Sequence, residues 1–211
     1  MKLYYHPQSG HSHRARLFLS LIGATCELIE VDLRKGAQHQ ASFMKLNPFG
    51  QIPVLEDEGV IVSDSNAILV YLARKFGRTD WLPEDAAGMA QVQRWLSVAA
   101  GEVTRGPCAA RLVTVWQENL TGAEEAIRRS HDLLRILNLY LSGQEWLALQ
   151  RPTLADVALY TYTAHAPEGN VDLSDYENVT SWLHRVERLP GFTPLMRTPV
   201  GLAARSASPA K

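Results

Sequence analysis

The sequence predicts an α/β domain at the N-terminus followed by an all-α domain. Up to about residue 77, short apolar segments with the period of strands alternate with segments that have the period of helices. From residue 86 on, only the helical period recurs. Pro83 marks this change of pattern, and 211 residues can form two small domains. We therefore expect a first domain at 1–77, a linker at 78–85 and an all-helical domain at 86–211.

The first domain is expected to have the element order βαβ-α-ββα. KLYYHP is typical of a strand, and SGHSHRARLFLSLIGA of a helix that Ser12 caps and Gly23 ends. CELIEVDL follows as a strand, and 34–46 as a polar loop with a short helix. QIPVL and GVIV are two further strands, and the helix that begins in SDSNAIL ends near Gly77. This order fits a thioredoxin-like layer with mixed parallel and antiparallel strands.

The second domain is expected to consist of helices only. Their predicted ranges are 86–117 with a break near Gly106-Pro107, 122–141, 154–166 and 179–187. Thr153 and Asp156 form the pattern of a capping box, so we expect Asp156 to be buried and to stabilise a helix without any chemical role. The tail from Pro199 is small and polar, which predicts a loosely held end.

The composition indicates a reducing compartment and no nucleic-acid or membrane partner. Lys and Arg number 21 against 22 Asp and Glu, so no net charge attracts polyanions. Cys26 and Cys108 are too few and too far apart for a disulfide scaffold, a CxxC motif or a metal site. The start, MKLYYHP, lacks the apolar core of a signal peptide, and no run of about 20 apolar residues could span a membrane. We expect a cytoplasmic protein without a metal.

The stretch from Asn47 to Leu72 combines two features of a ligand site. Pro53 cannot donate to a sheet ladder, and a cis peptide bond before it would present the backbone of Ile52 outward. Asp64 and Ser65 stand at the start of a helix, where free amides and the helix dipole favour an anion. Each feature alone is common, since Asp and Ser are ordinary N-cap residues. Together they would suit a small anionic peptide.

This block, in a chain of this length, resembles the glutathione S-transferase family, whose first domain is thioredoxin-like. The resemblance extends over nearly the whole chain and includes the Thr-x-x-Asp at the start of a buried helix. It implies that the main chain of Ile52, before Pro53, pairs with the cysteinyl part of glutathione. It also implies that Asp64 and Ser65 hold the γ-glutamyl end. The family usually has Glu-Ser there, and the shorter Asp implies a longer or water-bridged contact.

The first loop, HPQSGHSHRAR, offers several partners for the thiol of glutathione. A hydroxyl donor at a helix start favours the thiolate, which is the nucleophile. Serine-type transferases carry their catalytic Ser three residues before the Ser or Cys that opens the helix, which implies Ser9, with Ser12 at the helix start. His11 stands where the cysteine-type class has its Cys, so this chain departs from that type. Ser12, His11 and Tyr5 remain alternatives to Ser9.

The resemblance also implies binding residues for the glycine carboxylate of glutathione. Gln51 belongs to the NPxGQxP motif and is the firmest choice. Lys35, Gln38 and His39 lie in the loop where the family usually supplies a cation or an amide donor. The other reading of these loop residues is that they are merely solvated.

The second substrate is expected to contact the all-helical domain. AAGEVTRGPCAARLVTVW carries Arg105, Cys108 and Arg111 as candidates for an electrophile pocket. Arg105 could favour an electrophile that gains negative charge. The alternative is a helix that packs through Ala and Val and carries solvated Arg side chains.

Phe49 predicts a homodimer, because an exposed aromatic side chain on a loop has little other reason to be there. In several transferase classes such a residue fills a pocket of the partner subunit. The resulting interpretation is a cytoplasmic glutathione transferase that acts in detoxification on small hydrophobic electrophiles, with glutathione as co-substrate. The alternatives are glutathione-dependent disulfide or peroxide reduction, and a non-catalytic binding or stress-response module of the same fold.

Overall fold

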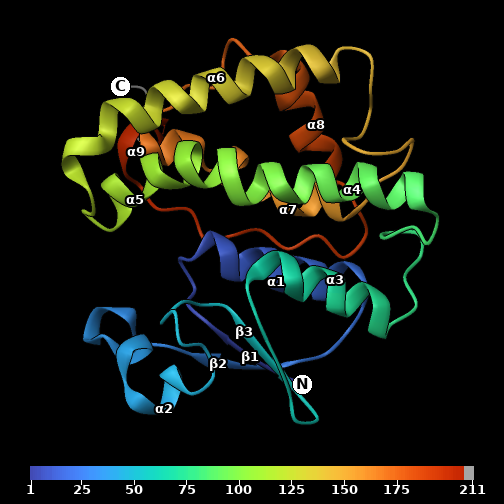
Figure 1. The fold of residues 1–211 in the computed structure, drawn as a ribbon. Coiled ribbons are helices and arrows are strands. Elements are labelled where there is room, and N and C mark those ends of the chain that lie inside the picture. The colour runs from blue at the N-terminus through green and yellow to red at the C-terminus, as the bar shows by residue number, and fades with distance from the viewer. Residues whose placement is uncertain (207–211) are drawn as a thin grey trace. The chain divides into compact units, whose positions relative to one another are not determined.

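A computed structural model describes residues 1–206 of the chain. It divides into two compact units (Figure 1). The first comprises Met1–Pro83 together with Leu189–Met196, and the second comprises Glu84–Arg188 and the chain from Arg197. The expected combination of a mixed four-stranded sheet with helices and an all-helical part is confirmed. No pattern in the sequence indicated that 189–196 would return to the first unit.

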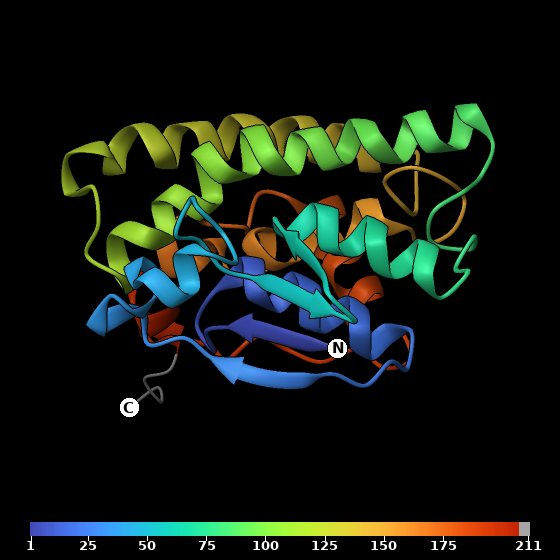
Figure 2. The ribbon, with the colours of Figure 1, turned by 60° about the horizontal axis from the view of Figure 1, so that its bottom comes forward.

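The sheet of the first unit has the strand order β2-β1-β3-β4 (Figure 2). Its strands are β1 (Lys2–Tyr5), β2 (Glu27–Glu30), β3 (Val54–Asp57) and β4 (Val60–Ser63). β1 pairs with β2 in parallel and with β3 antiparallel, and β3 pairs antiparallel with β4. Glu58 and Gly59, both at positive φ, form the two-residue turn between β3 and β4, a backbone suited to a hairpin.

Two helices cover one face of this sheet, α1 (Gly10–Leu21) and α3 (Ser65–Lys75) (Figure 1). Leu3 and Leu55 are opposite each other in the register of β1 and β3, and both are fully buried. The next pair, Tyr4 and Val54, points to the other face because side chains alternate along a strand. There Val54 packs with Phe43 in a second apolar cluster. That cluster lies under η1 (Leu33–Lys35), η2 (Ala37–His39) and α2 (Ala41–Met44).

The expected N-cap of the first helix is wrong by one turn. Ser9, not Ser12, occupies this position: its φ of −79° and ψ of 121° are non-helical. The Ser9 hydroxyl accepts a hydrogen bond of 3.2 Å from the backbone N–H of Ser12. Ser12 is the third residue of the helix, so local sequence offered two serines and the helix began at the earlier one.

The predicted break at Gly106-Pro107 is also wrong. The chain runs through α4 (Ala86–Val98), the π-helix η3 (Ala99–Cys108) and α5 (Ala109–Val115) without an interruption. A π-helix has wider turns than an α-helix, which relieves the clash between the ring of Pro107 and the preceding turn. A Cβ on Gly106 would lie 3.2 Å from the backbone nitrogen of Ser130, so this glycine lets η3 and α6 approach closely.

The remaining helices are η4 (Leu120–Gly122), α6 (Ala123–Leu141), α7 (Leu154–Ala164), η5 (Ala166–Gly169), α8 (Glu177–Glu187) and α9 (Gly201–Ser206). α7 is buried on all sides, and the capping box at its start is confirmed. Asp156 is fully buried and accepts hydrogen bonds from the backbone of Thr153 and, at 2.9 Å, from the indole of Trp182. None of the helices described is long and apolar enough to cross a membrane.

The tail is more ordered than its composition predicts. α9 packs against η5, and a Cβ on Gly201, whose φ is +56°, would lie 2.5 Å from the carbonyl oxygen of Glu168. Glycine is therefore required at this close contact. The expectation of a loosely held end is wrong up to Ser206, and its remainder, 207–211, lies outside the described residues.

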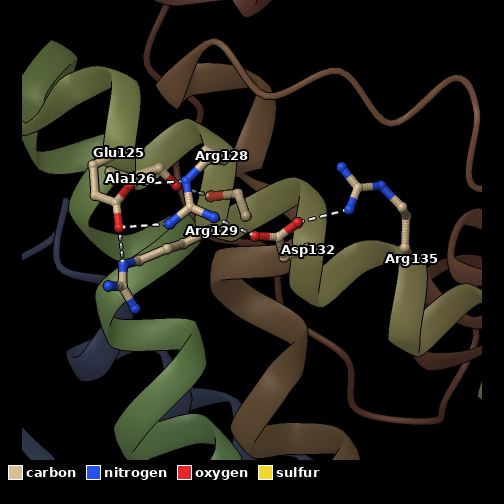
Figure 3. A network of polar contacts seen from close by, with 7 residues as sticks. Glu125, Ala126, Arg128, Arg129, Asp132 and Arg135 are labelled. Carbon is tan, nitrogen blue, oxygen red and sulfur yellow. Dashed lines mark hydrogen bonds and ion pairs between the residues drawn. The ribbon is translucent and has the colours of Figure 1, made fainter.

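The outer face of α6 carries charged residues at helical spacing, as its amphipathic pattern predicts (Figure 3). Glu125 pairs with Arg128 and Arg129, and Asp132 pairs with Arg128 and Arg135. These residues are three or four positions apart, which places them side by side on a helix. Exposed pairs of this kind contribute at most about 1 kcal/mol each to stability.

Candidate active site

Ser9 is held from three directions at the start of α1. Its backbone N–H donates to the carbonyl of His6 at 3.0 Å, and its own carbonyl accepts from the N–H of His13 at 2.9 Å. Its hydroxyl oxygen accepts from the N–H of Ser12. The hydroxyl proton has no acceptor within residues 1–206, and Ser9 is only half-buried. A hydroxyl carries one donor and two acceptor positions, so Ser9 can cap the helix and donate to a ligand at once.

Ser12 is buried in the protein, unlike the half-buried Ser9. Its side chain is fully buried, and its hydroxyl accepts from the backbone N–H of His6 at 3.3 Å. The imidazole of His6 accepts from the N–H of Gln8 at 3.2 Å. Ser12 and His6 therefore fix the shape of the loop that precedes α1.

Asp64 begins α3 in an unusual backbone conformation, with φ of 84° and ψ of 129°. One carboxylate oxygen, Oδ1, accepts from the N–H groups of Asn66 at 2.8 Å and Ala67 at 2.9 Å. The residue is exposed, so its second carboxylate oxygen faces solvent. A non-glycine residue at this φ costs roughly 1–3 kcal/mol, and such residues cluster at functional sites.

The next residue, Ser65, joins α3 to α1. Its hydroxyl accepts from the guanidinium of Arg14 at 2.8 Å and lies 3.3 Å from Nδ1 of His11. Arg14 also donates to the side chain of Asn66 at 2.9 Å. Burial and the positive charge of Arg14 lower the pKa of His11 to about 3, so this imidazole is neutral at ordinary pH. His11 and the buried Arg14 thus connect the N-terminal part of α1 to the start of α3.

The loop from Asn47 to Pro53 is organised by the side chain of Asn47, which is 3% exposed. Its Nδ2 donates to the carbonyl of Gln51 at 2.7 Å, and its Oδ1 accepts from the N–H of Phe49 at 3.1 Å. The Ile52–Pro53 peptide bond is cis, as expected. The main chain of Ile52 makes no hydrogen bond within residues 1–206, and Phe49 is 80% exposed.

The segment that contains η2 approaches this loop at Gly50. A Cβ there would lie 2.7 Å from Nδ1 of His39, and the φ of Gly50 is +61°. His39 therefore lies beside the residue that precedes Gln51, although the two are distant in the sequence. Lys35 is exposed and pairs with Asp32 at 3.0 Å. The side-chain oxygen of Gln38 is buried without a partner in the described part of the chain.

Comparison with known proteins identifies the family of this chain. Residues 1–74 match the family described as glutathione S-transferase, N-terminal domain, and residues 109–190 match its C-terminal domain. The chain belongs to the glutathione S-transferase family. It is 32% identical to glutathione S-transferase F10 of Arabidopsis thaliana over 194 residues, which cover 86% of this chain and 90% of that protein.

Solved structures agree with this assignment. A glutathione S-transferase from Pseudomonas fluorescens matches with a TM-score of 0.87 and 31% identity, over 93% of this chain and 98% of that one. A possible glutathione S-transferase from Rhodopseudomonas palustris matches with a TM-score of 0.85 and 31% identity, over 100% and 96%. The protein is a glutathione transferase, and neither the reductase nor the non-catalytic alternative is favoured.

Tyr5, the tyrosine considered as an alternative thiol partner, lies on β1 next to Tyr4. The hydroxyl of Tyr4 donates to Glu56 at 2.9 Å, and burial together with this carboxylate raises the pKa of Tyr4. The ring of Tyr5 is covered by the guanidinium of Arg16, 5.1 Å from the ring centroid.

The three electrophile-pocket candidates have different environments in the transferase. Arg105 is exposed on η3 and pairs with Glu102 at 2.6 Å. Cys108 is 3% exposed, and Arg111 is 1% exposed with its Nε 2.7 Å from Glu168. Arg111 therefore serves a buried ion pair, and only Arg105 keeps a surface for a ligand. No group of three metal-ligating side chains occurs in the region described.

Sequence reasoning missed Arg14 as part of this site. It was visible only as a basic residue near Arg16 in an otherwise helical segment. Its importance depends on contacts with Ser65 and Asn66, about fifty positions away, which no local pattern reveals.

Proposed function

We propose that the first unit binds glutathione across the starts of α1 and α3, and that the hydroxyl of Ser9 donates to its sulfur. The single observation that supports this assignment is the state of the Ser9 hydroxyl. Its oxygen already accepts from the helix backbone, while its proton is unused within residues 1–206. A thiolate can accept a hydrogen bond from this hydroxyl, and the positive end of the α1 dipole adds to the attraction.

The required stabilisation is modest. A free thiol of this type has a pKa of about 8.5, so a shift of roughly two units makes most of it thiolate at neutral pH. Two units correspond to about 2.7 kcal/mol, which is the size of one or two charge-assisted hydrogen bonds. The Ser9 hydroxyl and the amides of the first turn can supply this amount together.

The rest of the peptide is assigned to neighbouring groups. The exposed oxygen of Asp64 accepts from the γ-glutamyl ammonium, and Ser65 binds the adjacent carboxylate with the charge of Arg14 behind it. The unpaired main chain of Ile52, next to Pro53, bonds the cysteinyl segment. The hydrogen bonds of the Asp64 side chain to the first turn of α3 fix the backbone that carries Asp64 and Ser65.

Gln51 takes the glycine carboxylate, with His39 beside the neighbouring Gly50 as a further binding residue. Lys35, four positions before His39 and exposed, is the third candidate. His11 stays neutral and orients Ser65, and Ser12 acts through the loop at His6. These two residues shape the site and do not bind the thiol.

The reaction transfers the sulfur to an electrophilic carbon. The thiol proton leaves to solvent, the thiolate forms the carbon–sulfur bond with its lone pair, and the leaving group departs with the electrons of the bond that breaks. Small hydrophobic electrophiles are the proposed class, with Arg105 as a binding residue for one that gains negative charge. We place this activity in the cytoplasm and in detoxification, which fits a chain whose two cysteines are both free.

Ser9→Ala and Ser9→Gly test the central assignment. Both remove the hydroxyl, but an alanine N-cap costs about 1 kcal/mol of stability and a glycine only a few tenths. We expect both variants to bind glutathione, to lose its thiolate absorbance at a pH of about 6.5, and to turn over an aryl halide at least about tenfold more slowly. Equal thiolate in Ser9→Gly and wild type would refute the role of Ser9.

A homodimer with Phe49 at its interface is also proposed. A phenyl ring that is 80% exposed on a loop fixed by Asn47 is suited to enter a pocket of a second copy. Phe49→Ala is expected to shift the protein toward monomer in sedimentation at micromolar concentration. Asn47 is left intact so that the loop keeps its shape. A variant that remains a dimer of unchanged stability would contradict this role.

A further inference from the structure

The segment Leu189–Met196, here called the C-terminal strap, returns to the first unit and bonds to α1 at two places. The Nε2 atom of His13 lies 2.8 Å from the carbonyl oxygen of Thr193. About two helical turns further along α1, the hydroxyl of Ser20 donates to the carbonyl of Gly191 at 2.6 Å. The strap is thus fixed near the start of α1 and again near its end.

Backbone packing holds the strap close to the helix. A Cβ on Gly191 would lie 2.7 Å from the carbonyl oxygen of Ser20, and the φ of Gly191 is +83°. Only glycine fits such a contact without a shift of one backbone. Leu195, at the other end of the strap, is 3% exposed. The strap is therefore a packed part of the first unit.

His13 connects the strap to the proposed thiol partner. Its backbone N–H donates to the carbonyl of Ser9 at 2.9 Å, and its side chain is 1% exposed. Because a carbonyl can only accept, Nε2 must carry the proton in the contact with Thr193. One residue therefore bonds Ser9 through its main chain and the strap through its imidazole.

We propose that His13 is a positioning residue for the transferase reaction, which holds the first turn of α1 against Thr193 and so fixes the direction of the Ser9 hydroxyl. This inference rests on the proposed role of Ser9. A hydrogen bond to sulfur weakens steeply as its angle departs from linear, so a small rotation of the first turn would reduce thiolate stabilisation. His13 makes no contact with glutathione in this scheme.

The test compares His13→Asn, His13→Gln and Ser20→Ala. The amide nitrogen of Gln can reach the position of Nε2, whereas the side chain of Asn is too short. Ser20→Ala removes the other side-chain bond to the strap, far from Ser9. Each variant is examined by titration of bound glutathione through its thiolate absorbance, by kcat and KM with an aryl halide, and by urea unfolding.

We expect His13→Asn to raise the pKa of the bound thiol by about one unit and to lower kcat about tenfold, with glutathione affinity within about twofold of wild type. His13→Gln should recover most of both values. Ser20→Ala should lose stability while the thiol pKa stays at the wild-type value. An unchanged thiol pKa in a folded His13→Asn, or an equal shift in Ser20→Ala, would overturn the positioning role.

A second variant keeps the test decisive if His13→Asn does not fold. His13→Leu fills the buried volume of the imidazole but lacks a donor for the carbonyl of Thr193. A raised thiol pKa in His13→Leu would support the inference, and a wild-type value would refute it.

Failure of the underlying function has a different signature. If Ser9→Gly leaves the thiolate unchanged, the role of Ser9 is lost whatever the His13 variants do, and the positioning role is lost with it. If Ser9→Gly abolishes the thiolate and His13→Asn does not alter it, only the strap inference fails.

Discussion

Arg14 and Ser65 form a hydrogen bond of 2.8 Å that joins the second turn of α1 to the start of α3. The guanidinium is 1% exposed and also donates to Asn66. A buried charge is costly unless it is hydrogen-bonded, so the two bonds from Nη1 offset part of this cost and place a positive charge beside the proposed γ-glutamyl site. The N-terminal halves of the two helices are therefore linked through one side chain, next to the proposed glutathione site.

Arg14→Lys is expected to keep the charge, but its side chain is shorter and should fall short of the position of Nη1, the nitrogen that donates to both Ser65 and Asn66. Lysine is also a flexible point charge without the rigid planar head of a guanidinium. We expect a loss of about 2 kcal/mol in stability and roughly tenfold weaker glutathione binding. Calorimetry and urea unfolding measure these values, with Arg16→Lys, at a half-buried position of the same helix, as control. Wild-type affinity in Arg14→Lys would show that the charge alone matters.

Asp64→Gly should separate stability from binding. Glycine is relaxed at a φ of 84° and is a tolerable N-cap, so the variant should be as stable as wild type or up to about 1 kcal/mol more stable. Without the carboxylate, glutathione should bind at least about tenfold more weakly. Thermal unfolding and calorimetry test both parts.

Asp64→Asn is the matched control for this position. Asparagine keeps the cap and tolerates positive φ, but it lacks the charge. It should bind glutathione as weakly as Asp64→Gly without the gain in stability. Tight binding by either variant would remove Asp64 from the site.

His11 predicts a pH dependence of stability. Its pKa is about 3 in the folded protein and about 6.5 when unfolded, so between these values the unfolded chain binds the extra proton. Stability contributed by this group therefore falls as the pH decreases below about 6.5. Between about pH 7.5 and pH 5, wild type should lose about 1 kcal/mol more than His11→Gln, after a discount for the solvent that reaches this half-buried residue. Parallel stability curves for the two proteins would contradict the neutral imidazole.

Breaking the ion pair of Arg111 and Glu168 should destabilise the second unit far more than breaking a pair of the exposed network of Figure 3. Glu168 also accepts from His165 at 2.7 Å and from the N–H of Thr198 at 3.0 Å. Glu168→Gln leaves the charge of Arg111 buried without its partner, at a cost of about 3 kcal/mol or more. Glu125→Gln on α6 should cost less than about 1 kcal/mol. Equal losses in urea unfolding would disprove the distinction.

The same pair has a defined pH window. Burial acts to raise the pKa of Glu168, but the hydrogen bond with His165 and the charge of Arg111 outweigh it and hold the pKa below its usual range. The stability that this lowering contributes is present above the unfolded pKa, about 4.3, and is lost as the pH falls through the folded value. The difference between wild type and Glu168→Gln should therefore shrink below about pH 4.

Features encoded by neighbouring residues could be predicted from the sequence. The capping box of Thr153 and Asp156 and the helix start at Asp64 depend on groups within three positions. The sequence of strands and the change to helices at Pro83 follow from periodicity. The choice between Ser9 and Ser12 as N-cap did not follow, because both are good caps and the burial of Ser12 beside His6 decided it.

Apolar periodicity was therefore enough to predict the two domain classes, and short-range hydrogen bonding was enough to predict the helix starts at Asp64 and Thr153, while the family was predicted from the resemblance of the motifs. Packing of distant elements placed Arg14 against Ser65, paired Arg111 with Glu168 and brought the strap to His13. Each of these contacts joins residues that are far apart in the sequence. Their partners are selected by packing of whole elements, which leaves no mark in a local pattern.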